Sequence, residues 1–112
     1  MWTARTGFIE QNRAAVVDFL EDTVRAIRWY VDPKNHDEAV NVVASINKAP
    51  PARMGWAFGE HDQYRDPNGM PNLAALQSNV QQQKDVGFIK NDIDVKKYAD
   101  VSMVVEAAKR LT

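Results

Sequence analysis

The sequence predicts a mostly α-helical protein, an irregular array of about four to six helices with at most one short strand. Apolar residues recur at helical spacing in residues 14–31, 36–47, 73–86 and 100–112. Proline and glycine residues separate these segments. Because no internal repeat or low-complexity tract is present, we expect helices of unequal length within one domain that covers residues 1–112.

The central helix is predicted at Ala14–Val31, where the apolar arc spans roughly 200° of the helix surface. A helix that lies on a protein surface needs an apolar arc of only about 100°. The apolar side consists of Val16, Leu20, Val24, Ile27 and Val31, with Ala15, Phe19, Thr23, Ala26 and Tyr30 beside them. The opposite side carries Asp18, Glu21, Asp22, Arg25 and Arg28. We therefore expect neighbours to cover this helix on two sides.

Local signals bound the central helix. Thr6 and Gly7 precede an apolar pair and an acidic residue, as at a helix start, and Asn12 resets the helix before the central run. Pro33 forces Asp32 out of the helical region and ends the helix.

A second helix is predicted to begin with a capping box formed by Asn35 and Glu38 and to run through Asn47. Its predicted inner face consists of Ala39, Val40, Val43 and Ile46. After a proline pair, residues 52–58 predict a short helix in which Trp56 belongs to the core.

The third long helix follows a tight DPNG turn at residues 66–69, and Pro71 suits its first turn. Its predicted buried side consists of Leu73, Leu76 and Val80. Gly87 is expected to end this helix in a left-handed conformation, with Phe88 and Ile89 turning back toward the core.

The last part of the chain predicts a short turn followed by a helix. Asp94 can cap the turn, which Ile93 and Tyr98 are placed to staple. A final helix runs from Asp100 nearly to Thr112. Its predicted inner face consists of Val101, Val104, Val105, Ala108 and Leu111.

The composition excludes several classes of protein. The 112 residues carry 14 basic and 15 acidic side chains, and this net charge of −1 argues against a nucleic-acid partner. No apolar run approaches the length of a bilayer, and the first twenty residues show no secretory signal. Without cysteine, disulfides and thiolate metal sites are excluded.

No stretch carries a catalytic or cofactor signature. His36 lies at a helix start, and His61 lies in a polar loop without a second histidine four residues away, so we expect a hydrated loop rather than a metal site. None of the three serines lies in a GxSxG elbow, and no glycine-rich phosphate loop occurs. We therefore expect a non-enzymatic protein without a cofactor.

One short segment favours an anion. In TARTG, residues 3–7, a strand that ends at Arg5 would lead directly into a helix start. Free amide groups and the positive end of the helix dipole favour anions at such a place. The hypothesis is that Thr3, Arg5 and Thr6 line a pocket for an anionic ligand.

Two of the three tryptophans lie outside the predicted core. Trp2 is expected to be exposed unless protein precedes it. Trp29 lies at the edge of the charged arc, where it either stacks on Arg25 or packs against protein that this chain does not contain.

The order of segments resembles the C-terminal third of ABC-transporter solute-binding proteins of the nitrate, sulfonate and taurine type. The segments that carry the resemblance are FIEQN, VVDFLEDTVRAIRWYVD, NHDEAV, a tyrosine with RDPNG, KDVGFI and IDVKKYADVSMVVEAAKRL. They extend over nearly the whole chain.

The resemblance implies a periplasmic, non-catalytic protein of two α/β lobes that closes on a small anionic solute and delivers it to a membrane permease. It also implies that this chain is a fragment, with the first lobe and most pocket-forming strands upstream of Met1. An isolated fragment with such apolar faces would be expected to form a homo-oligomer. The alternative is a free-standing helical module that binds a partner protein.

Overall fold

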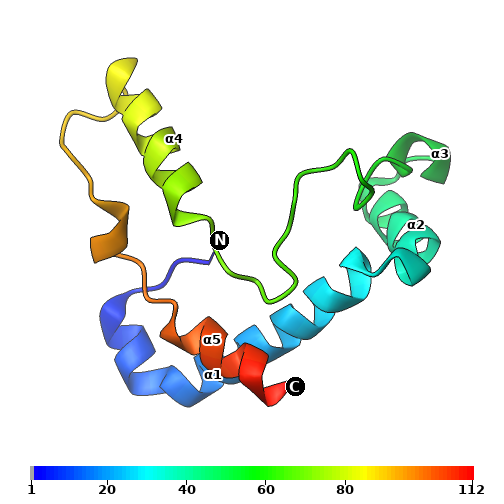
Figure 1. The fold of residues 1–112 in the computed structure, drawn as a ribbon, viewed down its shortest axis with the longest axis horizontal. Helices are drawn as coiled ribbons and strands as arrows, with labels where there is room; N and C mark the ends of the chain where they lie inside the picture. The colour runs from blue at the N-terminus through cyan, green and yellow to red at the C-terminus, as the bar shows by residue number, and fades with distance from the viewer. Residues whose placement is uncertain (1) are drawn as a thin grey trace.

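A computed structural model describes residues 2–112 and confirms a mostly α-helical, irregular array (Figure 1). The described residues form five α-helices and two single-turn 3-10 helices, with no strand. In chain order these are α1 (Thr6–Val31), η1 (Pro33–Asn35), α2 (His36–Asn47), α3 (Pro51–Met54), α4 (Leu73–Asp85), η2 (Val95–Lys97) and α5 (Ser102–Arg110).

The strand stub expected at the start of the chain is wrong for residues 2–5, and Met1 lies outside the described residues. Arg5 does have extended backbone angles, φ −71° and ψ 138°. However, no other described segment forms a strand that could pair with it, and an unpaired extended segment is not a sheet strand.

Helix α1 contains the predicted interruption. Asn12 leaves the helical region, with φ −129° and ψ 25°, and its side-chain amide donates to the carbonyl of Phe8 at 2.9 Å. This local bond competes with the helical hydrogen-bond ladder and explains the kink. Beyond it, Val17 and Val24 lie seven residues apart on one face and are fully buried.

Helix α5 lies against α1 and covers that face (Figure 1). Met103 and Ala107 pack on Val17 to form a small core, which Ile9, Val16 and Leu20 extend. The prediction that Val104 faces inward is confirmed, whereas the burial of Met103 and Ala107 was not predicted. Only this side of α1 is well covered, because Phe19 on the neighbouring row remains half exposed.

Ion pairs border the contact between α1 and α5. Arg13 pairs with Glu106 at 2.7 Å, and Arg110 pairs with Asp18 at 2.8 Å and with Glu21 at 3.6 Å. All of these groups are solvent-accessible, so each pair adds little energy and mainly fixes the register of the two helices. α5 begins at Ser102 rather than Asp100, since the carboxylate of Asp100 accepts from the amide of Ser102 at 2.9 Å.

Helix α2 buries Ala39, Val40 and Ala44, whereas the expected core residue Ile46 is 75% exposed. Among the described helices, α2 packs mainly on the short helix α3, with fewer contacts to η1 and α1, and these neighbours leave Ile46 uncovered. The predicted capping box is also wrong, because the side chain of Asn35 donates to the carbonyl of Trp29 at 2.9 Å.

The short helix predicted at residues 52–58 is a single turn, α3, followed by irregular turns. Within these turns Ala57 is buried, whereas Trp56 is 60% exposed and does not belong to the core. With only four helical residues, α3 presents too short a face to bury both side chains.

The predicted DPNG turn lies against the contact between α1 and α5. Gly69 has φ +72°, and a Cβ at this position would lie 3.3 Å from Ile27, 3.5 Å from Val24 and 3.6 Å from Val104. The carbonyl of Asp66 accepts from the amide of Gly69 at 2.9 Å. The glycine therefore provides both a left-handed backbone and a close approach to the helices.

Helix α4 stands away from α1 and α5 (Figure 1). Among the described helices, η2 is the one against which α4 packs. Leu73, Leu76 and Val80 are consequently only half-buried. Gly87 has φ +84° and ends the helix as predicted, but Phe88 is 84% exposed and does not turn back to a core.

The short turn after α4 is capped as predicted. The carboxylate of Asp94 accepts from the amide of Lys96 at 3.1 Å, at the start of η2. The proposed staple does not form, since Tyr98 is largely exposed.

The described residues form an unusually open structure. Their accessible surface is 8652 Å², whereas a compact monomer of 12.7 kDa exposes about 6,200 Å². The Cα radius of gyration is 16.8 Å, compared with about 13 Å for a compact domain of this length. No helix among residues 2–112 combines the length and apolarity needed to cross a bilayer.

Candidate functional site

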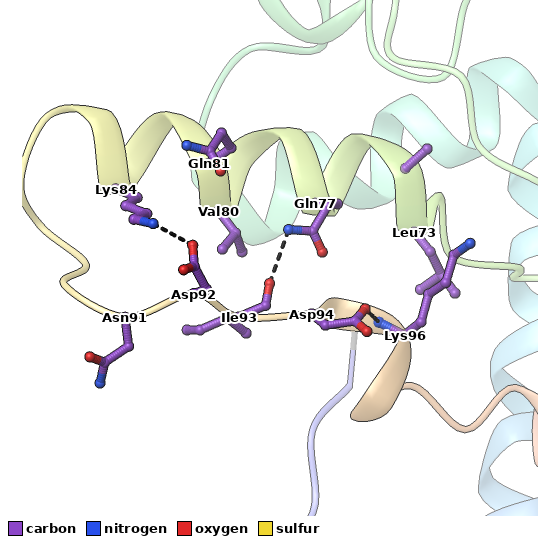
Figure 2. A pocket seen from close by; sticks show the side chains of 11 residues that line it. Leu73, Gln77, Val80, Gln81, Lys84, Asn91, Asp92, Ile93, Asp94 and Lys96 are labelled. Atoms are coloured by element: carbon purple, nitrogen blue, oxygen red, sulfur yellow. Dashed lines mark hydrogen bonds and ion pairs between the residues drawn. The ribbon is translucent and has the colours of Figure 1, made fainter.

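One cavity lies between α4 and the extended segment that follows it (Figure 2). Its volume is about 730 Å³. It is lined by Leu73, Ala74, Gln77, Val80, Gln81 and Lys84 of α4, and by Asn91, Asp92, Ile93, Asp94 and Lys96.

The side chain of Gln77 links the two sides of this cavity through hydrogen bonds. Its Nε2 donates to the carbonyl of Ile93 at 3.0 Å, and its Oε1 accepts from the amide of Val95 at 2.9 Å. The side-chain amide thus bonds to the extended backbone as a neighbouring strand would. Figure 2 shows a second link, the ion pair between Lys84 and Asp92.

The lining combines apolar side chains with charged side chains whose net charge is zero. Leu73, Val80 and Ile93 supply the apolar surface. The rim carries two lysines and two aspartates, whose charges balance. This cavity can accept an apolar group, but its lining includes no histidine, serine or cysteine that could serve as a nucleophile or a near-neutral base.

The cavity is not predicted by the sequence. The only local signal is Gln77, a polar residue four positions after Leu73 on the apolar side of α4. Its partners lie 16 and 18 residues further along the chain, so helical periodicity could not identify them.

The second cavity lies in the polar loop between α3 and α4 and has a volume of about 420 Å³. It is lined by Val31, Phe58, Gly59, Glu60, Asp62, Gln63, Tyr64, Arg65 and Pro67. Two of these residues, Asp62 and Arg65, form a salt bridge of 2.6 Å in which the aspartate side chain is 8% exposed.

Asp62 organises the loop through three hydrogen bonds. Its carboxylate accepts from the amides of Phe58 at 2.7 Å and Gln63 at 2.6 Å, as well as from Arg65. The bond from the Phe58 amide, followed by that from Arg65, lowers the pKa of Asp62 to about 2. The carboxylate is therefore charged at neutral pH, and both of its oxygens accept hydrogen bonds.

Phe58 occupies a strained position at this cavity, with φ +61°. Its ring lies 4.7 Å from that of Tyr30, centroid to centroid. The guanidinium of Arg65 lies 5.1 Å from the Phe58 ring centroid and 6.0 Å from that of Tyr30. The hydrogen bond to Asp62 and these aromatic contacts stabilise the left-handed backbone.

Thr3 and Arg5 precede α1 and Thr6 is its first residue, and all three are exposed. They line neither of the two cavities. The carbonyl of Arg5 accepts from the amides of Phe8 and Ile9 at 3.0 and 3.1 Å, and its side chain makes no capping bond.

The two histidines lie on different elements, His36 on α2 and His61 in the polar loop. His36 lies at the start of α2, with its Cε1 atom 3.8 Å from the position of a Cβ on Gly59, and His61 is exposed. Over residues 2–112, no group of three or more histidine, aspartate or glutamate side chains is arranged to hold a metal ion.

The tryptophans have different environments. Trp2 is 69% exposed, as expected, and its ring packs edge-on against Phe19 at 5.2 Å. Trp29 is partly exposed, while the guanidinium of Arg25 bonds to Glu21 at 2.9 Å and Asp22 at 3.2 Å. The cation–π contacts found among the described residues belong to Arg65, so stacking of Arg25 on Trp29 is not observed, and the contact of Trp29 with additional protein stays a prediction.

No family model, curated protein or solved structure matches this chain.

Proposed function

We propose that this chain forms the C-terminal helical part of a periplasmic solute-binding protein, which serves an ABC uptake transporter for a small organic anion. The protein would be non-catalytic. The succession of segments from FIEQN to the last helix supports the proposal, because it resembles that of the nitrate, sulfonate and taurine binders. The folded chain contains a long helix, a DPNG turn and a final helix in this order.

The observation that carries the proposal is the open surface of the folded chain. It exposes about 2,400 Å² more than a compact monomer of its mass. Exposed aromatic and aliphatic side chains occur on several elements, including Phe19 on α1, Ile46 on α2 and Phe88 after α4. Such a surface suits a segment that packs against a further lobe.

The proposed contribution to the solute pocket is at the start of α1. Arg5 supplies a fixed positive charge, and Thr3 and Thr6 supply hydroxyl donors. All three side chains are exposed and so are available to a ligand held between this segment and another lobe. The membrane permease would be the protein partner of the assembled binder.

Expression of the chain together with any coding sequence upstream tests this proposal. Thermal stability is measured with taurine, short alkanesulfonates, nitrate and sulfate. A true ligand at 100 times its dissociation constant stabilises the fold by about 2.7 kcal/mol. We expect stabilisation by one of these anions, its loss in Arg5→Ala, and its retention in the matched variant Arg53→Ala, which changes an exposed arginine on α3.

Absence of any upstream α/β lobe, together with no anion response, would contradict the transport role. The second candidate, a free-standing module that binds a partner protein, would then be favoured. The isolated position of α4, which packs only on η2 among the described helices, supports that candidate.

A further inference from the structure

The DPNG turn contains a pair of residues that is chemically reactive in an unfolded chain. Among the asparagines of the sequence, only Asn68 precedes a glycine, Gly69. Glycine has no Cβ to hinder the approach of its backbone nitrogen to the side-chain carbon of the preceding asparagine. Asn68 is also exposed to water, so this pair favours spontaneous deamidation.

Deamidation at such a pair proceeds through a cyclic imide. The backbone nitrogen of Gly69 loses its proton and attacks Cγ of Asn68, the Cγ–Nδ2 bond breaks, and the side-chain nitrogen takes up a proton and leaves as ammonia. Water then opens the ring at either carbonyl and yields aspartate or isoaspartate at position 68. The attack requires the reacting atoms to lie about 3–3.5 Å apart with aligned orbitals, so contacts that hold both groups slow the reaction.

The structure holds both reacting groups. The amide of Gly69 donates to the carbonyl of Asp66 at 2.9 Å, so the proton that must leave is hydrogen-bonded. The carboxylate of Asp66 also accepts from the amides of Asn68 at 2.8 Å and Met70 at 3.3 Å, which fixes the backbone of the turn. The side-chain oxygen of Asn68 accepts from the guanidinium of Arg28 at 2.7 Å.

Arg28 is itself held in place and cannot follow a movement of the Asn68 side chain. Its guanidinium also donates to the carbonyls of Leu111 at 3.0 Å and Ala108 at 3.2 Å, at the end of α5. The guanidinium stays charged at all physiological pH values. Rotation of the Asn68 side chain toward the Gly69 nitrogen therefore breaks a charge-assisted hydrogen bond.

We propose that Asn68 is a deamidation site that Arg28 protects, so that modification occurs when the DPNG turn leaves α1 and the end of α5. Isoaspartate adds a methylene group to the main chain of the turn. A Cβ on Gly69 would already lie 3.3 Å from Ile27 and 3.5 Å from Val24, so the lengthened turn cannot return without displacing these side chains. Isoaspartate would thus accumulate in chains whose turn has opened. The proposal concerns the chain by itself and does not rest on the transport role.

Ageing of the folded chain near neutral pH, followed by ion exchange and peptide mapping, tests the proposal. Deamidation adds a negative charge, and the mapped peptide identifies isoaspartate at position 68. We expect the chain in denaturing urea to deamidate about tenfold or more faster than the folded chain, since loss of a hydrogen bond from a charged donor corresponds to at least that factor. Arg28→Met should raise the rate in the folded chain by about tenfold as well.

Two variants separate local protection from general stability. Val17→Ala truncates a fully buried side chain of α1 but keeps the bonds of Arg28, and Arg53→Met removes an exposed arginine on α3. With circular dichroism showing all variants folded, Arg53→Met should deamidate at the wild-type rate and Val17→Ala more slowly than Arg28→Met. A folded wild-type chain that deamidates as fast as in urea would overturn the proposal. So would an Arg28→Met rate at or below that of the wild type, or one that Val17→Ala equals.

Discussion

The guanidinium of Arg28 on α1 donates to the backbone carbonyl of Leu111, just beyond α5, at 3.0 Å. It also reaches the carbonyl of Ala108 at 3.2 Å and the side-chain oxygen of Asn68 at 2.7 Å. The last carbonyls of a helix have no partner within the helix, and a cation there also complements the dipole. One side chain therefore joins α1, the end of α5 and the DPNG turn.

Substitution of Arg28 should destabilise the fold more than loss of an ordinary surface arginine. Arg28→Met removes three hydrogen bonds from a charged donor, and we expect the free energy of unfolding to fall by about 1.5–3 kcal/mol. Urea denaturation followed by circular dichroism measures this loss. Arg53→Met serves as the control on an exposed arginine, and equal losses for both variants would show that the bridge contributes nothing.

Substitution of Gly69 tests the packing of the DPNG turn, and substitution of Gly55, outside this turn, is the control. Gly69→Ala introduces a Cβ 3.3 Å from Ile27 at φ +72°, so we expect a loss of about 1–3 kcal/mol. Gly55 has φ −61° and open space around it, so Gly55→Ala should be neutral or slightly stabilising. Thermal unfolding of the two variants provides the comparison, and a neutral Gly69→Ala would show that the turn does not pack on the helices.

The charge on Asp62 should stabilise the loop at neutral pH. Its pKa in the folded chain, about 2, lies below the ordinary value of 3.8, so its contribution is present above pH 3.8 and is lost as the pH falls toward 2. Chemical-shift titration of the carboxylate by NMR measures this pKa directly. Arg65→Met should raise it, because the guanidinium donates to the charged form. A pKa near 3.8 in the wild-type chain would contradict the observed hydrogen bonding.

The core between α1 and α5 should be sensitive to a single truncation. Val17 is fully buried against Met103 and Ala107, and Val17→Ala should cost about 2–3 kcal/mol from lost burial and the cavity left behind. Val42 on α2 is half exposed, so Val42→Ala should change stability by less than about 0.5 kcal/mol. Similar losses for the two variants would be evidence against this packing.

Local chemistry made much of the fold predictable from the sequence. The kink at Asn12, the turn that ends at Gly69 and the left-handed end of α4 at Gly87 depend on neighbouring residues alone, and all three were expected. Periodicity also placed the long helices. It identified the apolar side of α2 but not what covers that side, which is why Ile46 was wrongly assigned to the core. The cap at Gly87 was predicted correctly, but the contact expected for Phe88 after it does not form.

The two cavities could not be predicted, because they depend on contacts between separated segments. Gln77 meets Ile93 only after the chain reverses beyond α4, and Arg65 meets Tyr30 only when the polar loop returns to α1. The proposed anion site at Arg5 remains a prediction that depends on protein outside this chain.

The central claim is that the folded chain is open, with α4 standing away from the contact between α1 and α5. Small-angle X-ray scattering, extrapolated to zero concentration, tests this openness most directly. We expect a radius of gyration for the monomer near the 16.8 Å of the structure. A value of about 13 Å, that of a compact domain of this length, would contradict it.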